Sequence, residues 1–192
     1  MLFSSISFLY YFLPVVLTVY FLAPAKYKNL VLLLASFAFY FWGEPIYSLL
    51  MALSIISAYL HGIWISKAQH SQARKLALTS SVVVSISTLG FFKYYAFFIN
   101  TINPVFDSTL DPLNLALPIG ISFYTFQILS YTIDLYKGTV KVQTSLINFA
   151  TYVALFPQLI AGPIVRYTTV EAALVNRKHT IADITYGINR FI

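Results

Sequence analysis

Six long runs of apolar residues follow one another along this chain and leave little room for a water-soluble fold. Most of them approach the ~20 residues that a helix needs to cross the hydrocarbon core of a bilayer. The runs cover approximately residues 2–22, 29–42, 46–65, 76–99, 115–136 and 145–165. Only 9% of the 192 residues are charged, against roughly 25% in a soluble domain. The runs predict an all-α, polytopic membrane protein in which residues 1–192 form a single membrane domain.

Composition and charge exclude several classes of function. The chain has no cysteine, so it has no disulfide, no thiolate metal site and no cysteine nucleophile. The net charge of +6 does not indicate nucleic-acid binding, because the Lys and Arg residues stand at the ends of apolar runs, as in the cytoplasmic loops of membrane proteins. We therefore expect the chain to be surrounded by membrane lipid and not to bind nucleic acid.

The basic residues of the first five loops are concentrated in every second loop. They are Lys26, Lys28, Lys67, Arg74, Lys75, Lys137 and Lys141. The loops between them carry Glu44, Asp107 and Asp111, with Lys93 as the one cation nearby. Because positively charged loops resist translocation, we expect the basic loops in the cytoplasm and the N-terminus on the opposite side.

The sixth run breaks this charge pattern. If it crossed the membrane fully, the basic residues after it would lie outside: Arg166, Arg177, Lys178 and Arg190. The run contains Pro157 and the pair Gly162-Pro163, and helix-breaking residues are tolerated at membrane depth where the freed backbone groups face protein or water. A broken or re-entrant segment would return the basic residues to the cytoplasm, whereas a kinked crossing would not, and the sequence leaves both open.

Polar residues share one face of the fifth run. The helical offsets 0, 4, 7, 8 and 11 belong to Phe123, Gln127, Ser130, Tyr131 and Asp134. One interpretation is a polar stripe that faces a substrate passage, because polar groups in a membrane seldom face lipid. The other is a set of hydrogen bonds between helices. For Asp134, an ion pair with Lys137 three residues later is the simplest role.

The three histidines are weak catalytic candidates. His61 lies late in the third run, where a buried hydrogen-bonding role is favoured, and His70 and His179 lie in polar stretches typical of solvated loops. The spacing of histidines and carboxylates offers no metal site. The residues alone therefore leave a membrane enzyme with a polar cavity, a transporter with broken helices, or a non-catalytic membrane scaffold.

Several stretches together resemble the membrane-bound O-acyltransferase family, in particular its bacterial branch with the alginate O-acetyltransferases. They are residues 117–127 (LPIGISFYTFQ), 130–138 (SYTIDLYKG), 155–166 (LFPQLIAGPIVR), 3–14, 40–45 and 90–95. The first three are long and specific, and the resemblance runs over essentially the whole chain. It corresponds to the N-terminal part of a family member.

The resemblance implies a fold and an activity. The fold is a ring of helices around a thin centre. The activity is transfer of an acyl group, most simply acetyl, to a hydroxyl of an exported polysaccharide. Alginate, cellulose, another exopolysaccharide and a peptidoglycan-type glycan are all compatible acceptors. The implied donor is acetyl-CoA or an acyl carrier, used as a co-substrate with no bound cofactor. The implied location is the bacterial inner membrane, with periplasmic acetylation-complex proteins as partners.

The chain departs from the family in one respect. Family members are more than twice as long, and their essential histidine, the general base, lies in a C-terminal half that these 192 residues lack. We therefore expect an N-terminal fragment with no catalytic residue and no acyl transfer of its own. The motif positions that remain would shape the passage: Gln127, Tyr131, Asp134, Pro157, Gly162, Pro163 and Arg166.

The predicted orientation can be tested with single cysteines, because the chain has none of its own. We expect a membrane-impermeant thiol reagent added outside to label Asp107→Cys but not Arg74→Cys, since basic loops stay in the cytoplasm. The reverse labelling pattern would overturn the orientation.

Overall fold

The computed structural model describes residues 5–105, 116–161, 165–177 and 180–191, and these residues form helices without strands. The all-α prediction is therefore confirmed. The described chain contains one π-helix (η1), one 3₁₀ helix (η2) and nine α-helices: η1 Ser7–Phe12, α1 Leu13–Leu22, η2 Ala25–Tyr27, α2 Lys28–Gly43, α3 Pro45–Lys67, α4 Ser71–Val105, α5 Ile121–Lys137, α6 Leu146–Ala154, α7 Phe156–Ala161, α8 Tyr167–Val175 and α9 Ile181–Phe191. α3 and residues Ser71–Asn103 of α4 are long and apolar enough to cross a membrane.

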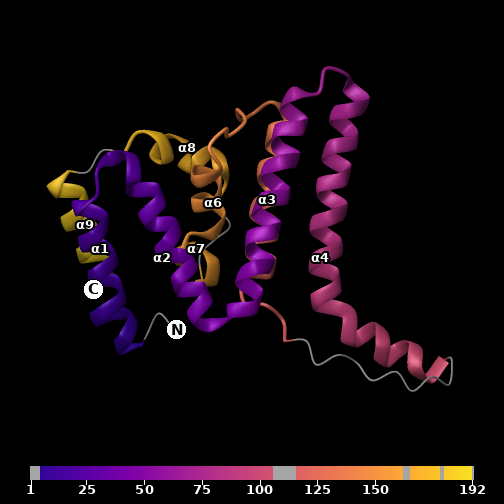
Figure 1. Ribbon diagram of the computed structural model, residues 1–192, viewed down its shortest axis with the longest axis horizontal. Helices are drawn as coiled ribbons and strands as arrows, with labels where there is room; N and C mark the ends of the chain where they lie inside the picture. The colour runs from indigo at the N-terminus through magenta and orange to yellow at the C-terminus, as the bar shows by residue number, and fades with distance from the viewer. Residues whose placement is uncertain (1–4, 106–115, 162–164, 178–179, 192) are drawn as a thin grey trace.

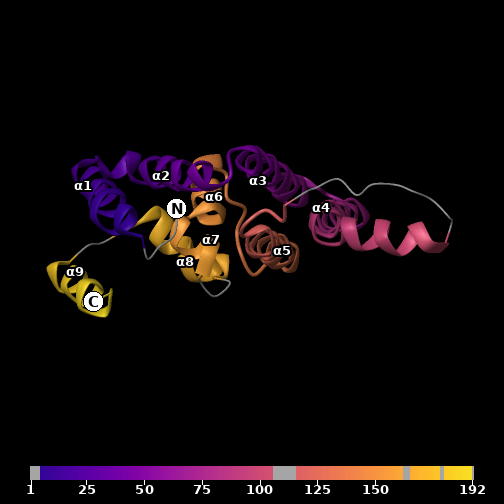
Figure 2. The same cartoon turned by 90° about the horizontal axis from the view of Figure 1, so that it is seen from below.

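The helices lie in two layers. α1, α2, α3 and α4 follow one another across the molecule, and α5, α7 and α8 lie behind them, with α6 between α2 and the second layer (Figures 1 and 2). α5 packs against α3, α4, α6, α7 and α8. It is therefore the helix around which the two layers are assembled.

The polar face of α5 is buried against these neighbours. Gln127 is 2% exposed and Tyr131 1% exposed. A Cβ atom added to Gly62 of α3 would come within 3.1 Å of the Tyr131 ring, so α3 and α5 approach closely at a position where glycine leaves room for that ring. α5 ends at Gly138, whose positive φ of 78° suits the left-handed residue that follows many helices.

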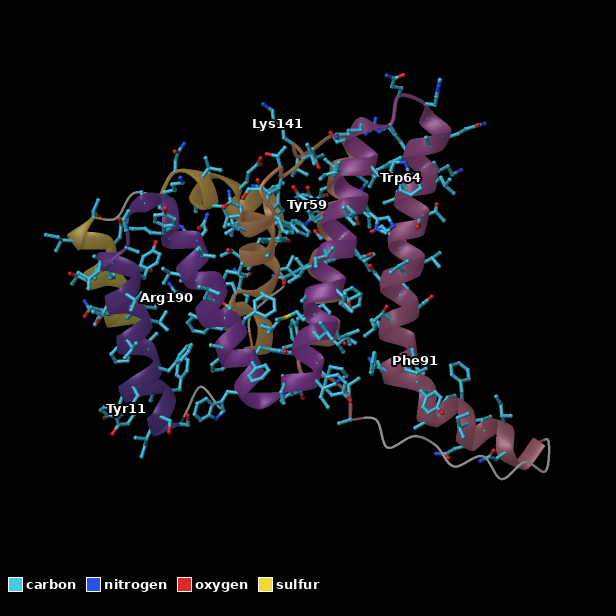
Figure 3. The ribbon with its side chains drawn as sticks, viewed as in Figure 1. Tyr11, Tyr59, Trp64, Phe91, Lys141 and Arg190 are labelled. Atoms are coloured by element: carbon cyan, nitrogen blue, oxygen red, sulfur yellow. The ribbon has the colours of Figure 1, made fainter. Side chains whose placement is uncertain are left out.

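The three basic loops lie at one end of the molecule. The α1–α2 connection, the α3–α4 connection and the chain after α5 are all at the top of Figure 1, and Lys141 projects there in Figure 3. The α2–α3 connection, which contains Glu44, lies at the opposite end. The folded chain thus separates the basic loops from this acidic turn along the helix axes.

The sixth apolar run is not one continuous helix. α6 ends at Ala154, Leu155 leaves the helical conformation, and α7 occupies Phe156–Ala161. The predicted break at Gly162-Pro163 lies outside the described residues. The chain then returns to the end of the molecule from which α6 starts. This return is seen in the hydrogen bond that Gln143, just before α6, donates from Nε2 to the hydroxyl of Tyr167 at the start of α8.

Gly120, at the entry to α5, should not tolerate a side chain. Its φ is +75°, and an added Cβ would lie 2.7 Å from the carbonyl oxygen of Leu159. Gly120→Ala should therefore lose about 1–3 kcal/mol to the clash, in addition to the strain of a left-handed alanine. The matched control is Gly138→Ala, which has the same φ region but nothing within 4 Å of the added Cβ. Thermal unfolding of both variants in detergent measures the difference, and equal losses would contradict the account.

Candidate functional site

A pair of amide side chains links the central helix to the broken segment. Gln127 on α5 donates from Nε2 to Oε1 of Gln158 on α7 at 3.1 Å. The Oε1 atom of Gln127 is buried without a hydrogen-bond partner. A buried polar atom that lacks a partner costs free energy, about 1–3 kcal/mol, so this amide is the kind of group that a bound polar ligand or a water would satisfy.

Gln158 also lines a cavity of about 400 Å³. The cavity lies among α1, α2, α6, α7 and α8, and its walls are Tyr20, Leu32, Thr151, Tyr152, Leu155, Gln158, Val170, Ala173, Leu174, Asn176 and Arg177. Most of these side chains are apolar, with a small number of polar groups among them. This combination is common in small-molecule sites, where the polar groups fix the orientation of the ligand.

Cationic groups surround Tyr20 at the edge of this cavity. Arg177 donates from Nη1 to the Tyr20 hydroxyl at 3.2 Å, and its guanidinium lies 5.7 Å from the centre of the ring. The ammonium of Lys28 lies 5.0 Å from the same ring centre. Next to Lys28, Asn29 donates to the carbonyl oxygen of Leu174 at 2.8 Å. The cavity therefore has a positively charged edge at the end of the molecule where the basic loops lie.

A second polar cluster holds α5, α6 and α8 together. The backbone N–H of Gln143 donates to the Tyr131 hydroxyl at 3.0 Å, and its side chain donates to the Tyr167 hydroxyl at 2.9 Å. Its Oε1 atom accepts from the backbone N–H of Ser145 at 2.9 Å. Burial raises the pKa of the Tyr167 phenol, against the lowering effect of the Gln143 hydrogen bond, so this phenol stays neutral at physiological pH.

The sequence suggested an ion pair with Lys137 as the simplest role for Asp134. The surroundings of Asp134 in the structure are different. The Oδ2 atom of Asp134 is buried without a hydrogen-bond partner. Its carbonyl oxygen accepts from the backbone N–H groups of Gly138 and Thr139, which closes the end of α5. Nearby in sequence, Arg74 of α4 donates to the carbonyl oxygen of Tyr136 at 3.0 Å.

The seven residues chosen from the sequence divide into three groups. Gln127, Tyr131 and Asp134 lie on the face of α5 that packs inward, and Gln127 reaches the cavity through Gln158. Pro157 and Arg166 are exposed, and Gly162 and Pro163 lie outside the described residues. Their role in shaping a passage stays a prediction.

Sequence reasoning missed four residues that matter to this geometry: Gln143, Gln158, Tyr20 and Arg177. Gln158 lies inside the quoted motif at residues 155–166, next to a proline within an apolar run, and that position could have identified it. Nothing in the local pattern around Gln143 distinguishes it from a solvated loop residue.

The described histidines have structural contacts. His61 on α3 bridges to α4, with Nε2 3.1 Å from the Ser80 hydroxyl and Nδ1 2.7 Å from the carbonyl oxygen of Ser57. His70 is exposed between α3 and α4, and His179 lies outside the described residues. Within the described ranges, no group of three or more His, Asp or Glu side chains could hold a metal ion.

Comparison with known proteins gives relatives along the entire chain. The "Probable alginate O-acetylase AlgI" of Azotobacter vinelandii is 40% identical and that of Pseudomonas aeruginosa is 41% identical, each over 100% of this chain. The "Peptidoglycan O-acetyltransferase" of Helicobacter pylori is 34% identical over 88% of the chain. No family model and no solved structure matches.

The chain spans 40%, 38% and 37% of the length of these three relatives. The match covers every motif on which the family resemblance rested, and the relatives carry names of O-acetylating enzymes. The resemblance is therefore confirmed: the chain is a relative, over its whole length, of the alginate O-acetylases of the membrane-bound O-acyltransferase family.

Proposed function

We propose that this chain is part of a membrane-bound O-acetyltransferase that modifies an exported polysaccharide. The observation that carries the proposal is about 40% identity over the whole chain to alginate O-acetylases. The identity to the peptidoglycan O-acetyltransferase is lower, at 34%. This difference favours an alginate-like acceptor, a polysaccharide of uronic acids, over a peptidoglycan glycan strand.

The proposed location is the bacterial inner membrane, crossed several times. The basic loops lie at one end of the folded chain, and positively charged loops remain cytoplasmic. Residues 145–167 form a re-entrant segment in this proposal, because Gln143 contacts both Ser145 and Tyr167 and so brings the two ends of the segment together. Arg166 then lies near the cytoplasmic face.

The cavity beside Gln158 is the proposed entry for the acyl donor. Both donor types that the family resemblance implies, acetyl-CoA and an acyl carrier, present the acyl group as a thioester on an anionic, phosphate-bearing arm. Arg177 and Lys28 supply positive charge at the cavity edge, and charge-assisted hydrogen bonds to phosphate are among the stronger polar contacts. The apolar walls suit the uncharged part of the arm.

The reaction itself is an ester-forming transfer. The oxygen of an acceptor hydroxyl attacks the acyl carbonyl carbon, a carbon–oxygen bond forms, and the bond from that carbon to the donor sulfur breaks. A general base takes the hydroxyl proton, and the thiolate that leaves is protonated. The residues of this chain would bind and orient the donor, with the Gln127–Gln158 pair as a hydrogen-bonding group beside it, and the base would come from the remainder of the protein.

A hybrid protein tests the proposed activity. In the Pseudomonas aeruginosa relative, the matching part would be replaced by residues 1–192 of this chain, and the hybrid expressed in an alginate-producing strain without its own O-acetylase. We expect acetyl esters on the secreted alginate, measured by proton NMR, and none when residues 1–192 are expressed alone. A hybrid that is folded in the membrane but leaves alginate unacetylated would contradict the proposal, and acetylation by the chain alone would show that the base lies within it.

The proposed donor site has a sharper test in the same hybrid. Arg177→Gln should raise the KM for the acyl donor about tenfold, because the loss of one charge-assisted hydrogen bond is worth about 1.4 kcal/mol or more, and kcat should change little. Arg190→Gln is the matched control, since that exposed guanidinium contacts the Tyr186 hydroxyl on its own helix. An unchanged KM for the donor in Arg177→Gln would show that Arg177 and this cavity do not bind the acyl donor.

A further inference from the structure

The helix α4 is too long to be a simple membrane crossing. Its 35 residues would extend about 52 Å if straight, whereas the hydrocarbon core is about 30 Å thick. The sequence predicted a crossing over residues 76–99, but the structure bends near Phe91, and the rest of α4 runs sideways, away from the other helices, in both views (Figures 1, 2 and 3). The first 20 residues, 71–90, already account for about 30 Å.

The bend has a local cause in the sequence. The Thr88 hydroxyl donates to the carbonyl oxygen of Val84 at 2.9 Å, a contact that often bends helices. Gly90 follows directly, and an added Cβ there would meet nothing within 4 Å. Close packing therefore does not require a glycine at this position. The absence of a side chain instead leaves the backbone freer to bend here.

A ring contact fixes the depth of the bend. Phe92 packs edge-on against Tyr47, with ring centres 5.7 Å apart. Tyr47 is in the first turn of α3, three residues after Glu44 in the polar α2–α3 turn. The bend therefore lies at the level where α3 begins, at the end of the molecule opposite the basic loops.

The sideways segment, residues 91–103, is amphipathic. Phe91, Tyr95, Phe98 and Ile102 follow helical spacing along one face. Lys93, Ala96 and Asn100 lie on the other, and Phe97, which is 62% exposed, stands at the edge of that second face. Within the described residues, the rings of this apolar face remain exposed: Phe91 is 48% and Phe98 58% exposed.

Lipid fits this face better than a protein partner does. Exposed apolar side chains are present on both sides of the bend, with Val84 44% exposed before it, so the segment adjoins the surface of α4 that faces lipid. Aromatic side chains are enriched at membrane–water interfaces, and six of these thirteen residues are Phe or Tyr. Lys93 is their one charged residue, so apolar insertion and not charge attraction would hold the segment.

We infer that residues 91–103 form an interfacial helix that lies in the extracytoplasmic leaflet, with the Phe91–Phe98 face in the acyl chains and the Lys93–Asn100 face toward water. Such helices bury their apolar face at the boundary between headgroups and acyl chains. The helix holds the outer end of α4 at the membrane surface and marks the plane of the outer leaflet.

Two nitroxide-labelled variants of the full chain in phosphatidylcholine vesicles containing phosphatidylglycerol test this inference. Phe98→Cys and Asn100→Cys lie on opposite faces and are both exposed, so neither substitution disturbs the core. We expect position 98 to be accessible mainly to oxygen, which concentrates in lipid, and position 100 mainly to a water-soluble nickel chelate. Val84→Cys gives the reference for a lipid-facing site.

Three results would overturn the inference. Nickel access at both positions would place the segment in water, and oxygen access at both would place it across the lipid. Low access of both reagents at position 98 would show a protein contact. The pattern should persist in vesicles without phosphatidylglycerol, and its loss there would show that charge, not the aromatic face, holds the segment.

Discussion

The hydrogen bonds of Gln143 hold together the parts of the chain on which the rest of the structure depends. This one residue bonds to Tyr131 on α5, to Ser145 before α6 and to Tyr167 at the start of α8. In an apolar surrounding each of these polar groups needs a partner within the protein. As a result, α6 and α8 begin at the same end of the molecule. The cavity beside Gln158 is lined in part by the segment between them.

Most of the helices were predictable from the sequence, because long apolar runs bounded by charged or helix-breaking residues leave few alternatives. The break after α2 follows from Gly43-Glu44-Pro45, and α3 does begin at Pro45. The bend in α4 was not predictable from the apolar pattern, because residues 71–103 contain no proline and read as one continuous helix. Only the contact between Tyr47 and Phe92 shows that the bend lies at the level where α3 begins.

The candidate site was predictable in part. The polar face of α5 was visible from helical spacing, and of the two interpretations offered for it the structure displays hydrogen bonds to neighbouring segments at Gln127 and Tyr131. The cavity was not visible, because its walls come from two stretches of chain that are far apart in sequence, α1 with α2 and α6 to α8. The positive edge likewise arises only when Arg177, just after α8, and Lys28 of α2 both come beside the Tyr20 ring of α1.

We propose that the segment between Gln143 and Tyr167 begins and ends on the cytoplasmic side, which would put the cavity where an acyl donor arrives. Labelling of Lys141→Cys and Arg166→Cys by an impermeant maleimide tests it most directly, because both side chains are exposed. The account predicts that both positions react in inside-out membrane vesicles and that neither reacts in intact cells. Reaction of Arg166→Cys in intact cells, with Lys141→Cys protected, would show a full crossing and contradict the account.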